Sequence, residues 1–500
     1  MRRARAVAAL AAVTALGWAG AVHAQSYRLR LDVRGQSVGY RGATRDSIAA
    51  TDVVTGSNGG LETPDGFAVE CSPGAAFCTY YRPGPKVDAG AVTTTADIAA
   101  WGFGLEGLSL HGSARLGVGL GDTDAWPGTD PALQVFEGYA QYVRRAITAR
   151  LGRQFVISRL GYAGFDGGRV LWRHRDLGLD AEAYAGWSLA RAAAVPVTST
   201  SLNPLDEYQP RQRFVLVGAA AGWTRHPVDV RLRYEREIDP AVDRVVGERV
   251  GADVTVDGPL GLSLAARADS DIAAGLLGNA EAALGYAHGR LAARFGARQY
   301  RPYFPLWTIW GAFSPVPYVA TFGSVTLGPF DGLSLRASGE RYSYDDAEAD
   351  VPLATVETDG WRWNGGGTLT YHAWVFRLAY QRDDGPGGRS EGWEGGVSFT
   401  PMPALTVAAR GGKHFRALEL RYSDSDLWLV GLEGTYRVSD MLRTNLGIVR
   451  YDECRDRPDA AAFAWDQLRL VAGLSVVFGT RADRGVLPEA IRRMPQAGER

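Results

Sequence analysis

The sequence predicts an all-β protein: a single transmembrane antiparallel up-and-down β-barrel of about 22 strands, with short periplasmic turns and long extracellular loops. Three observations lead to this prediction. Many stretches alternate apolar and polar residues, short turn-like breaks join these stretches in pairs, and longer polar segments separate the pairs. The clearest breaks are Pro401–Ala404 and Ser439-Asp440. Repeated units of strand, tight turn and strand are typical of membrane barrels.

The first residues predict a signal peptide. Arginines precede an apolar run from Ala6 to Gly20, and Val22–Ala24 supplies small residues before a cut that leaves Gln25 first. The apolar run is too short to span a bilayer as a helix. We therefore expect three parts: a signal peptide at 1–24, a barrel at 25–479 and a polar periplasmic tail at 480–500.

The composition fits a barrel and excludes one class of partner. No later run of about 18 apolar residues could form a membrane helix. The chain has 63 Gly, 14 Trp and 21 Tyr among its 500 residues. Glycine lets strands curve, and Trp and Tyr suit membrane–water interfaces. The formal net charge of −1 argues against a general nucleic-acid binder, which needs a basic surface.

The spacing of the short turns gives the number of strands. Neighbouring turns are separated by the length of two spanning strands plus one outer loop. Counting two strands for each turn and one more at each end gives about 22, within a range of about 18 to 22. An even number places both termini in the periplasm. The expected turns are Glu106-Gly107, Arg144-Arg145, Arg175-Asp176, His226-Pro227, Gly258-Pro259, His288-Gly289, Pro329-Phe330, His372-Ala373, Met402-Pro403 and Ser439-Asp440.

The two faces of the strands can be recognised from their period of two. Leu468, Leu470, Ala472, Leu474, Val476 and Phe478 alternate with polar and small residues in the last strand. Apolar faces often end in aromatic residues near the turns, as expected for a girdle at a membrane interface. These aromatic residues are Tyr286, Tyr371, Trp374, Phe399 and Tyr436.

Longer segments connect the other ends of the strands. They are expected at 41–90, 191–211, 299–317, 343–358 and 451–464. Short connections on one rim and long ones on the other resemble the bacterial outer-membrane barrels of the porin-like class, over Gln25–Gly479. This resemblance implies an integral outer-membrane protein in contact with lipids and lipopolysaccharide. Phe478 matches the aromatic residue that ends the last strand in many such barrels, but the tail after it departs from that pattern.

The cysteines suggest an oxidising compartment. Cys71 and Cys78 are close together in a polar loop, so we expect a local disulfide between them. Cys454 is expected in another loop and has no evident partner. A metal site built from the three cysteines is an alternative, although the paired spacing of such sites is missing.

One motif matches an enzyme pattern. Gly388–Gly392 fits the G-x-S-x-G pattern of serine hydrolases, which need the serine on a turn between a strand and a helix. Here Ser390 is expected in a glycine-rich hairpin loop, and chance explains the match better. The chain has no P-loop, no H-E-x-x-H and no C-x-x-C-H motif. We expect no enzymatic activity and no cofactor.

Histidines and aspartates offer two possible ligand sets. His174, His226, His288 and His372 are expected near the short turns, where a ring of haem or metal ligands competes with ordinary turn residues. Each belongs to a different hairpin, so the four cannot share one ion. Asp pairs in the outer loops could hold Ca²⁺ or form a solvated rim. These pairs are Asp122 and Asp124, Asp345 and Asp346, Asp383 and Asp384, and Asp424 and Asp426.

One expected outer loop is unusually apolar. The segment from Tyr300 to Tyr318 contains Phe304, Trp307, Trp310 and Phe313. So many aromatic residues are rarely left in water. The loop therefore either folds into the lumen as a constriction, binds a ligand or partner, or caps the barrel.

The inferred inner face carries both signs of charge. Its charges either pair across neighbouring strands or set the selectivity of a pore. The candidate lumen-facing residues are Arg115, Arg231, Arg233, Arg267, Asp269, Arg294, Arg336, Glu340, Arg377, Arg410, Glu433 and Arg437, with further acidic residues at Glu182, Asp229, Glu235, Asp253 and Glu281. A lining of nearly balanced charge predicts a weak preference between anions and cations.

Two functions fit such a barrel. The first is a porin-like channel for passive movement of small solutes, with loops folded inward as constrictions. The second is a sheath, similar to the barrel component of porin–cytochrome conduits, that wraps a multihaem cytochrome across the outer membrane. About 22 strands enclose a wide lumen that is usually blocked by a plug domain, and none is evident here. What fills the lumen therefore distinguishes the two functions.

Overall fold

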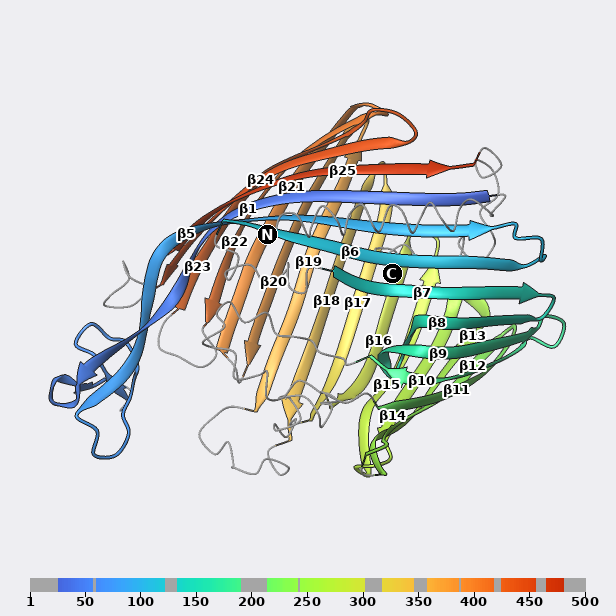
Figure 1. Ribbon diagram of the computed structural model, residues 1–500, viewed down its shortest axis with the longest axis horizontal. Helices are drawn as coiled ribbons and strands as arrows, with labels where there is room; N and C mark the ends of the chain where they lie inside the picture. Colours follow the sequence, from blue (N-terminus) through green and yellow to red (C-terminus); the bar gives the residue numbers. More distant parts are fainter. Residues whose placement is uncertain are drawn as a thin grey trace.

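A computed structural model describes residues 26–56, 60–121, 133–189, 214–241, 243–301, 317–345, 358–385, 388–417, 424–455 and 465–480. Most of the described residues form one closed antiparallel sheet (Figure 1). The expected signal peptide and the expected tail after Thr480 lie outside these residues. No described helix is long and apolar enough to cross a membrane.

Twenty-two long strands form the wall. They are β1 (Ser26–Ala49), β5 (Phe77–Trp101), β6 (Leu108–Gly121), β7 (Leu133–Arg144), β8 (Ile147–Ser158), β9 (Gly161–His174), β10 (Leu179–Ser188), β11 (Val215–Arg225), β12 (Val228–Asp239), β13 (Arg244–Asp257), β14 (Leu262–Asp271), β15 (Leu276–His288), β16 (Leu291–Tyr300), β17 (Tyr318–Phe330), β18 (Leu333–Tyr344), β19 (Asp359–Tyr371), β20 (Trp374–Gly385), β21 (Gly388–Met402), β22 (Leu405–Ala417), β23 (Asp424–Arg437), β24 (Leu442–Arg455) and β25 (Trp465–Gly479). The small elements are β2 (Val54–Thr55), β3 (Leu61–Glu62), β4 (Val69–Glu70) and the 3-10 turns η1 (Ala50–Asp52) and η6 (Pro259–Gly261).

The ring closes between the first and last strands. Each wall strand pairs with its neighbours in sequence, and β1 pairs with both β5 and β25. Closure leaves no unpaired edge around the ring, which is the main hazard of an open sheet. The predicted fold class and the strand number are confirmed.

Ten short connections lie on one rim, near the sequence positions predicted for them. Only one is displaced: Pro329-Phe330 ends β17, and the turn is Asp331-Gly332. The Thr480 amide donates to the Tyr27 carbonyl at 3.1 Å, so the two ends of the described wall meet on this same rim. We call it the short-turn rim.

The opposite rim is less uniform than the sequence suggested. The connections between β8 and β9, between β12 and β13, and between β14 and β15 are also short. Aspartate side chains stabilise two of these turns: Asp239 accepts from the Ala241 amide at 2.9 Å, and Asp271 accepts from the Ala274 amide at 3.1 Å.

The expected loop at 41–90 is largely strand, and that prediction was wrong. β1 and β5 stay paired from Ser26↔Trp101 to Ala49↔Phe77, whereas β25 pairs with β1 only up to Val38. The two strands therefore project beyond their neighbours as a long hairpin, at the lower left of Figure 1. The polar, glycine and proline residues of this part show no apolar period of two, so its strands are not recognisable from the sequence.

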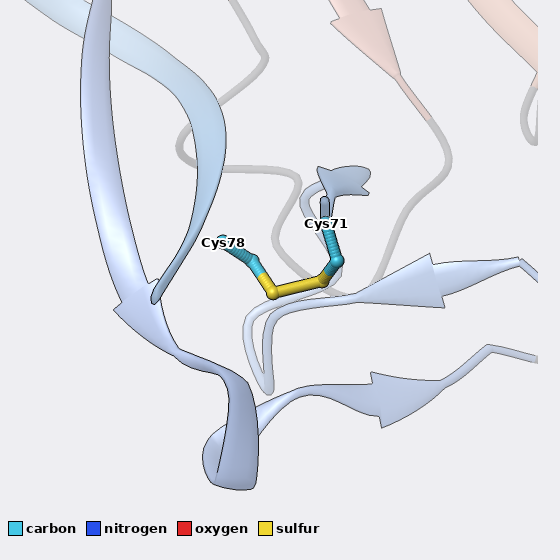
Figure 2. The surroundings of a disulfide bond; sticks show 2 residues. All are labelled: Cys71 and Cys78. Atoms are coloured by element: carbon cyan, nitrogen blue, oxygen red, sulfur yellow. A yellow bond between two sulfur atoms is a disulfide. The ribbon is translucent and has the colours of Figure 1, made fainter. Parts of the chain in front are cut away.

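A disulfide links Cys71 and Cys78 at the end of this hairpin (Figure 2), with an S–S distance of 2.00 Å. Cys78 lies in β5 and is 1% exposed. Cys454 was expected in a loop but lies in β24, where it is an exposed free thiol. It belongs to the strand because β24 continues to Arg455 in register with β23.

The outer face of the wall has an apolar band between two rows of aromatic residues. On β19, Trp361 and Trp363 lie near one end and Tyr371 near the other, all exposed. Ten residues of strand tilted by about 40° span about 25 Å, the height of the apolar band in membrane barrels. The predicted girdle residue Trp374 stacks on Phe399 with ring centroids 4.2 Å apart.

Candidate functional site

The inner face of the sheet is identified by a contact across the ring. The connection between β8 and β9 reaches β13, where the Arg249 guanidinium donates to the Leu160 carbonyl. Three strands, β10 to β12, separate these elements along the wall. Leu160 is 2% exposed and Arg249 is 7% exposed. Such a buried contact passes through the interior, so Arg249 and the residues in register with it face the lumen.

An ion-pair cluster holds this connection against the wall. Arg159 Nε lies 2.6 Å from Asp253 Oδ1, and an Arg159 Nη atom lies 3.7 Å from Asp269 Oδ2. The Asn279 side chain also donates to Asp269, at 3.1 Å. Buried charges are stable only when they are paired and hydrogen-bonded, and this cluster meets that condition.

The lumen beside this cluster is filled by side chains of the wall. Val156, Ala163, Phe165, Tyr184 and Leu216 form a buried apolar cluster. Phe165 and Leu216 are fully buried, and Phe165 stacks on Tyr184 with ring centroids 5.3 Å apart. The ring therefore curls tightly from β8 to β14, at the right of Figure 1, and part of its interior is a packed core.

Glycines allow inward tyrosines to lie flat across neighbouring strands. A Cβ atom at Gly218 would come within 2.0 Å of the Tyr184 ring. Because Gly218 has none, Tyr184 crosses β11 and donates from its hydroxyl to Glu235 on β12 at 3.0 Å. The tyrosine hydroxyl thereby donates a hydrogen bond to an inward carboxylate two strands away.

On β14 to β20 most inward charges are paired between strands. Glu281 lies between Arg267 and Arg294 and pairs with both. Arg298 pairs with Glu340, and Arg362 Nε lies 2.7 Å from Asp383. Arg362 also lies over the Tyr342 ring, 4.2 Å from its centroid. These side chains neutralise one another and leave little net charge here.

In the wall from β18 through β25 to β1, the inward charges near the short-turn rim are not all paired. Several inward arginines there have no carboxylate partner among the described residues. They are Arg28, Arg34, Arg336, Arg377, Arg437 and Arg443. An uncompensated row of guanidinium groups gives this side of the lumen a positive potential.

All twelve lumen-facing candidates from the sequence fall on the inner face by register. Arg231 pairs with Asp180 at 2.9 Å, Arg410 with Glu433 at 3.1 Å, and Arg115 donates to Gln134 at 2.8 Å. Of the others, Arg267, Asp269, Arg294 and Glu340 belong to the paired clusters, and Arg336, Arg377 and Arg437 to the unpartnered row. Arg233 lies on β12, directly opposite Gly251 of β13. Their role in a pore remains a prediction.

Sequence reasoning missed several inward residues. Arg28 and Arg34 share a face with Asp32 in β1, and the period of two could have found them. Arg159, Leu160 and Arg249 meet only because the ring curls, and no local signal predicts that contact.

The residues considered from the sequence as possible catalytic or metal-binding groups do not come together in one site. Ser390 lies within β21, opposite Asp383, and not in a hairpin loop or on a turn between a strand and a helix. The four histidines His174, His226, His288 and His372 lie at or beside four different short turns. Among the described residues no group of three or more potential metal ligands occurs.

Most of the described aspartates of the expected pairs lie in strands and not in loops, which corrects that prediction. Asp383 pairs with Arg362, Asp384 with Arg382 at 2.6 Å and Asp426 with Lys413 at 2.9 Å. These residues extend the ladder beyond the apolar band, because strands in barrels continue past the membrane boundary. Asp345 directly follows β18. Asp122, Asp124 and Asp346 lie outside the described residues, as do Phe304, Trp307, Trp310 and Phe313 of the aromatic loop.

Comparisons with known proteins give low similarity. No protein family matches the sequence, and no curated protein matches it. Among solved structures, the fold is similar to a BenF-like porin from Pseudomonas fluorescens Pf-5, with 12% identity, a TM-score of 0.39 and coverage of 90% of this chain and 99% of that one. It is also similar to OccK3 (OpdO) of Pseudomonas aeruginosa, with 12% identity, a TM-score of 0.38 and coverage of 91% and 96%. The fold assignment rests on this chain's own strand pairing.

Proposed function

We propose that this protein is an outer-membrane β-barrel that forms a channel for passive movement of small solutes. The observation that carries the proposal is the division between the two faces of one closed sheet. The outer face is an apolar band with aromatic borders, and the inner face carries arginines that have no carboxylate partner among the described residues. Unpaired charges are stable in a lumen only where water solvates them.

The same features support the location and orientation. Membrane barrels have short turns on the periplasmic side, so the short-turn rim and both termini would face the periplasm. The expected signal peptide at 1–24 agrees with export. Lipids and lipopolysaccharide would contact the apolar band.

The packed region from β8 to β14 favours a solute channel. A ring of 22 strands is wide enough to need a filling. Here Leu160, Phe165 and Leu216 occupy part of the interior and narrow the water-filled part. No described observation favours the sheath around a multihaem cytochrome. Likewise, no described side chains form a catalytic arrangement, so we assign no enzymatic activity.

Single-channel recording tests the proposal. The full mature chain is purified in detergent, its folded state is checked by heat-modifiable mobility, and it is inserted into a planar lipid bilayer. Stepwise ionic conductance is expected, together with swelling of proteoliposomes in small sugars. A folded barrel that conducts no ions and swells no liposomes would contradict the channel. Haem absorbance in protein purified from its native membrane would support the sheath instead.

A further inference from the structure

Four arginines gather at the short-turn mouth of the lumen. Arg437 ends β23, Arg443 is the second residue of β24, and Arg28 and Arg34 lie on β1. All four line one cavity of about 620 Å³, with the polar side chains of Thr435, Asn445 and Ser475 between them. The cavity spans five consecutive strands, β22, β23, β24, β25 and β1.

Two of these arginines are held directly opposite each other. Arg437 and Arg443 are partners in the register of β23 and β24, and both are exposed to the lumen. Like charges at directly opposed positions destabilise a sheet. No carboxylate of the described residues lies within ion-pair distance of either one. An arrangement that costs stability and lacks an internal partner is typical of a binding site.

The other charges around the cavity do not compensate this cluster. Asp32 pairs with Arg30 at 2.7 Å, and Glu433 pairs with Arg410 at 3.1 Å. Arg469 adds a further positive charge and donates to Gln467 at 3.1 Å. Asp440 lines the rim of the cavity in the turn after β23. The arginines Arg28, Arg34, Arg437 and Arg443 therefore leave the cavity positive even with Asp440 counted.

The segment after β25 does not have the composition to neutralise the arginine cluster. Residues 481–500 carry Arg481, Arg484, Arg492, Arg493 and Arg500 against Asp483, Glu489 and Glu499. A segment with an excess of arginine is repelled by an arginine cluster. The occupant is better sought among solutes.

The spacing of the arginines defines the class of that solute. Neighbouring strands are about 4.8 Å apart, and Arg34 and Arg28 lie two and four residues along β1 from Asp32, the position level with Arg443. The arginine anchors on β24 and β1 are therefore roughly 12 to 16 Å apart. Each guanidinium can bind a carboxylate or phosphate through two parallel hydrogen bonds. Two anionic groups on one small molecule can therefore reach opposite sides of the cavity. The Asn445 side chain, which lies over Gly473, adds a polar group between them.

We propose that this cavity is a binding site for small solutes that carry two or more carboxylate or phosphate groups. The site would raise their concentration at the short-turn mouth of the channel. This inference rests on the proposed channel function and names the class of solute that the channel favours.

The test removes the opposed pair and keeps the fold. In Arg437→Gln/Arg443→Gln, two charges are removed and hydrogen-bonding side chains remain. The matched control is Arg382→Gln/Arg450→Gln, which removes two charges from the outer face, where Arg382 and Arg450 pair with Asp384 and Asp452. Reversal potentials in a KCl gradient give the chloride-to-potassium permeability ratio, and added citrate and pyrophosphate are tested as blockers.

The wild-type channel and the control should prefer chloride and be blocked by both anions. The cavity variant should lose about two- to fourfold of the chloride preference, because two charges about 10 Å from the ion path act through screened water. Block by citrate alone would assign the site to carboxylates, and block by pyrophosphate alone would assign it to phosphates. Equal permeability ratios in the cavity variant and the control would overturn the proposal.

Calorimetric titration of the detergent-solubilised barrel with pyrophosphate and with citrate tests the site without requiring conductance. Binding that the cavity variant loses supports the site even if no channel is seen, which would contradict the channel alone. Binding of neither anion to the wild-type protein would overturn the site, whereas conductance without anion preference would leave the channel function intact.

Discussion

Tyr342 lies flat against Gly360 on the inner face of the barrel. A Cβ atom at Gly360 would come within 2.2 Å of the Tyr342 ring, so no other residue fits at this position without displacing the tyrosine. From there the Tyr342 hydroxyl donates to Asp383 at 2.8 Å, two strands away. Tyr184, Gly218 and Glu235 repeat the arrangement on β10 to β12. The two sets link alternate strands of the wall.

Gly360→Ala should destabilise the barrel by about 1 to 3 kcal/mol, because the added methyl group clashes with Tyr342 and breaks its hydrogen bond to Asp383. Equilibrium unfolding in guanidinium chloride, followed by tryptophan fluorescence, measures the change. Gly365→Ala on the same strand is the control, since the nearest atom to its Cβ would be at 3.8 Å. Equal stability of the two variants would contradict the role given to Gly360.

The closed ring of strands could be predicted because the sequence patterns that indicate it are local. Alternation marks each strand, and turn-forming residues such as Ser439-Asp440 mark each short connection. Once the register is known, pairs such as Arg362 and Asp383 follow, since they are directly opposite on β19 and β20. The sequence therefore predicted the strand number.

Features that depend on the shape of the whole ring were not predictable. Leu160 and Arg249 are 89 residues apart and meet only because β8 to β14 curl inward. The projecting part of β1 and β5 lies beyond the rest of the ring, and its residues show no apolar period. The unpartnered state of Arg437 and Arg443 likewise depends on which neighbours the register supplies.

Arg159→Ala should release the β8–β9 connection from the opposite wall. Asp253 and Asp269 then lose a cation, and Asp269 is only 4% exposed, so we expect a loss of about 3 kcal/mol in unfolding free energy. Because the connection occupies the lumen, single-channel conductance should rise as well. Arg159→Lys keeps the charge and should give a smaller change. Unchanged conductance and stability in Arg159→Ala would show that the ion pairs do not hold the connection.

Removing the disulfide with Cys71→Ser/Cys78→Ser should affect the projecting hairpin and not the barrel. The two cysteines are 7 residues apart, so the bond closes a small local loop. We expect faster proteolytic cleavage between Ala49 and Phe77, with the unfolding midpoint of the barrel unchanged. Cys454→Ser is the control, because that thiol is free and exposed, and its digestion pattern should match wild type. A lower unfolding midpoint in the double variant would show that the hairpin stabilises the ring.

Glu281→Gln should both weaken the barrel and shift its selectivity. Glu281 is 7% exposed in its side chain and lies between Arg267 and Arg294, so its neutralisation leaves two inward arginines facing each other. One lost negative charge about 10 Å from the ion path favours chloride and disfavours potassium by about 0.4 kcal/mol each, which corresponds to roughly a fourfold rise in the chloride-to-potassium permeability ratio before screening by salt. The rise should therefore be larger at low ionic strength than at high.

Glu391→Gln is the control: it removes one negative charge from an outward position paired with Arg389 and should leave the permeability ratio unchanged. A ratio in Glu281→Gln that matches this control at low salt would mean that the β14–β16 wall does not face the conducting path.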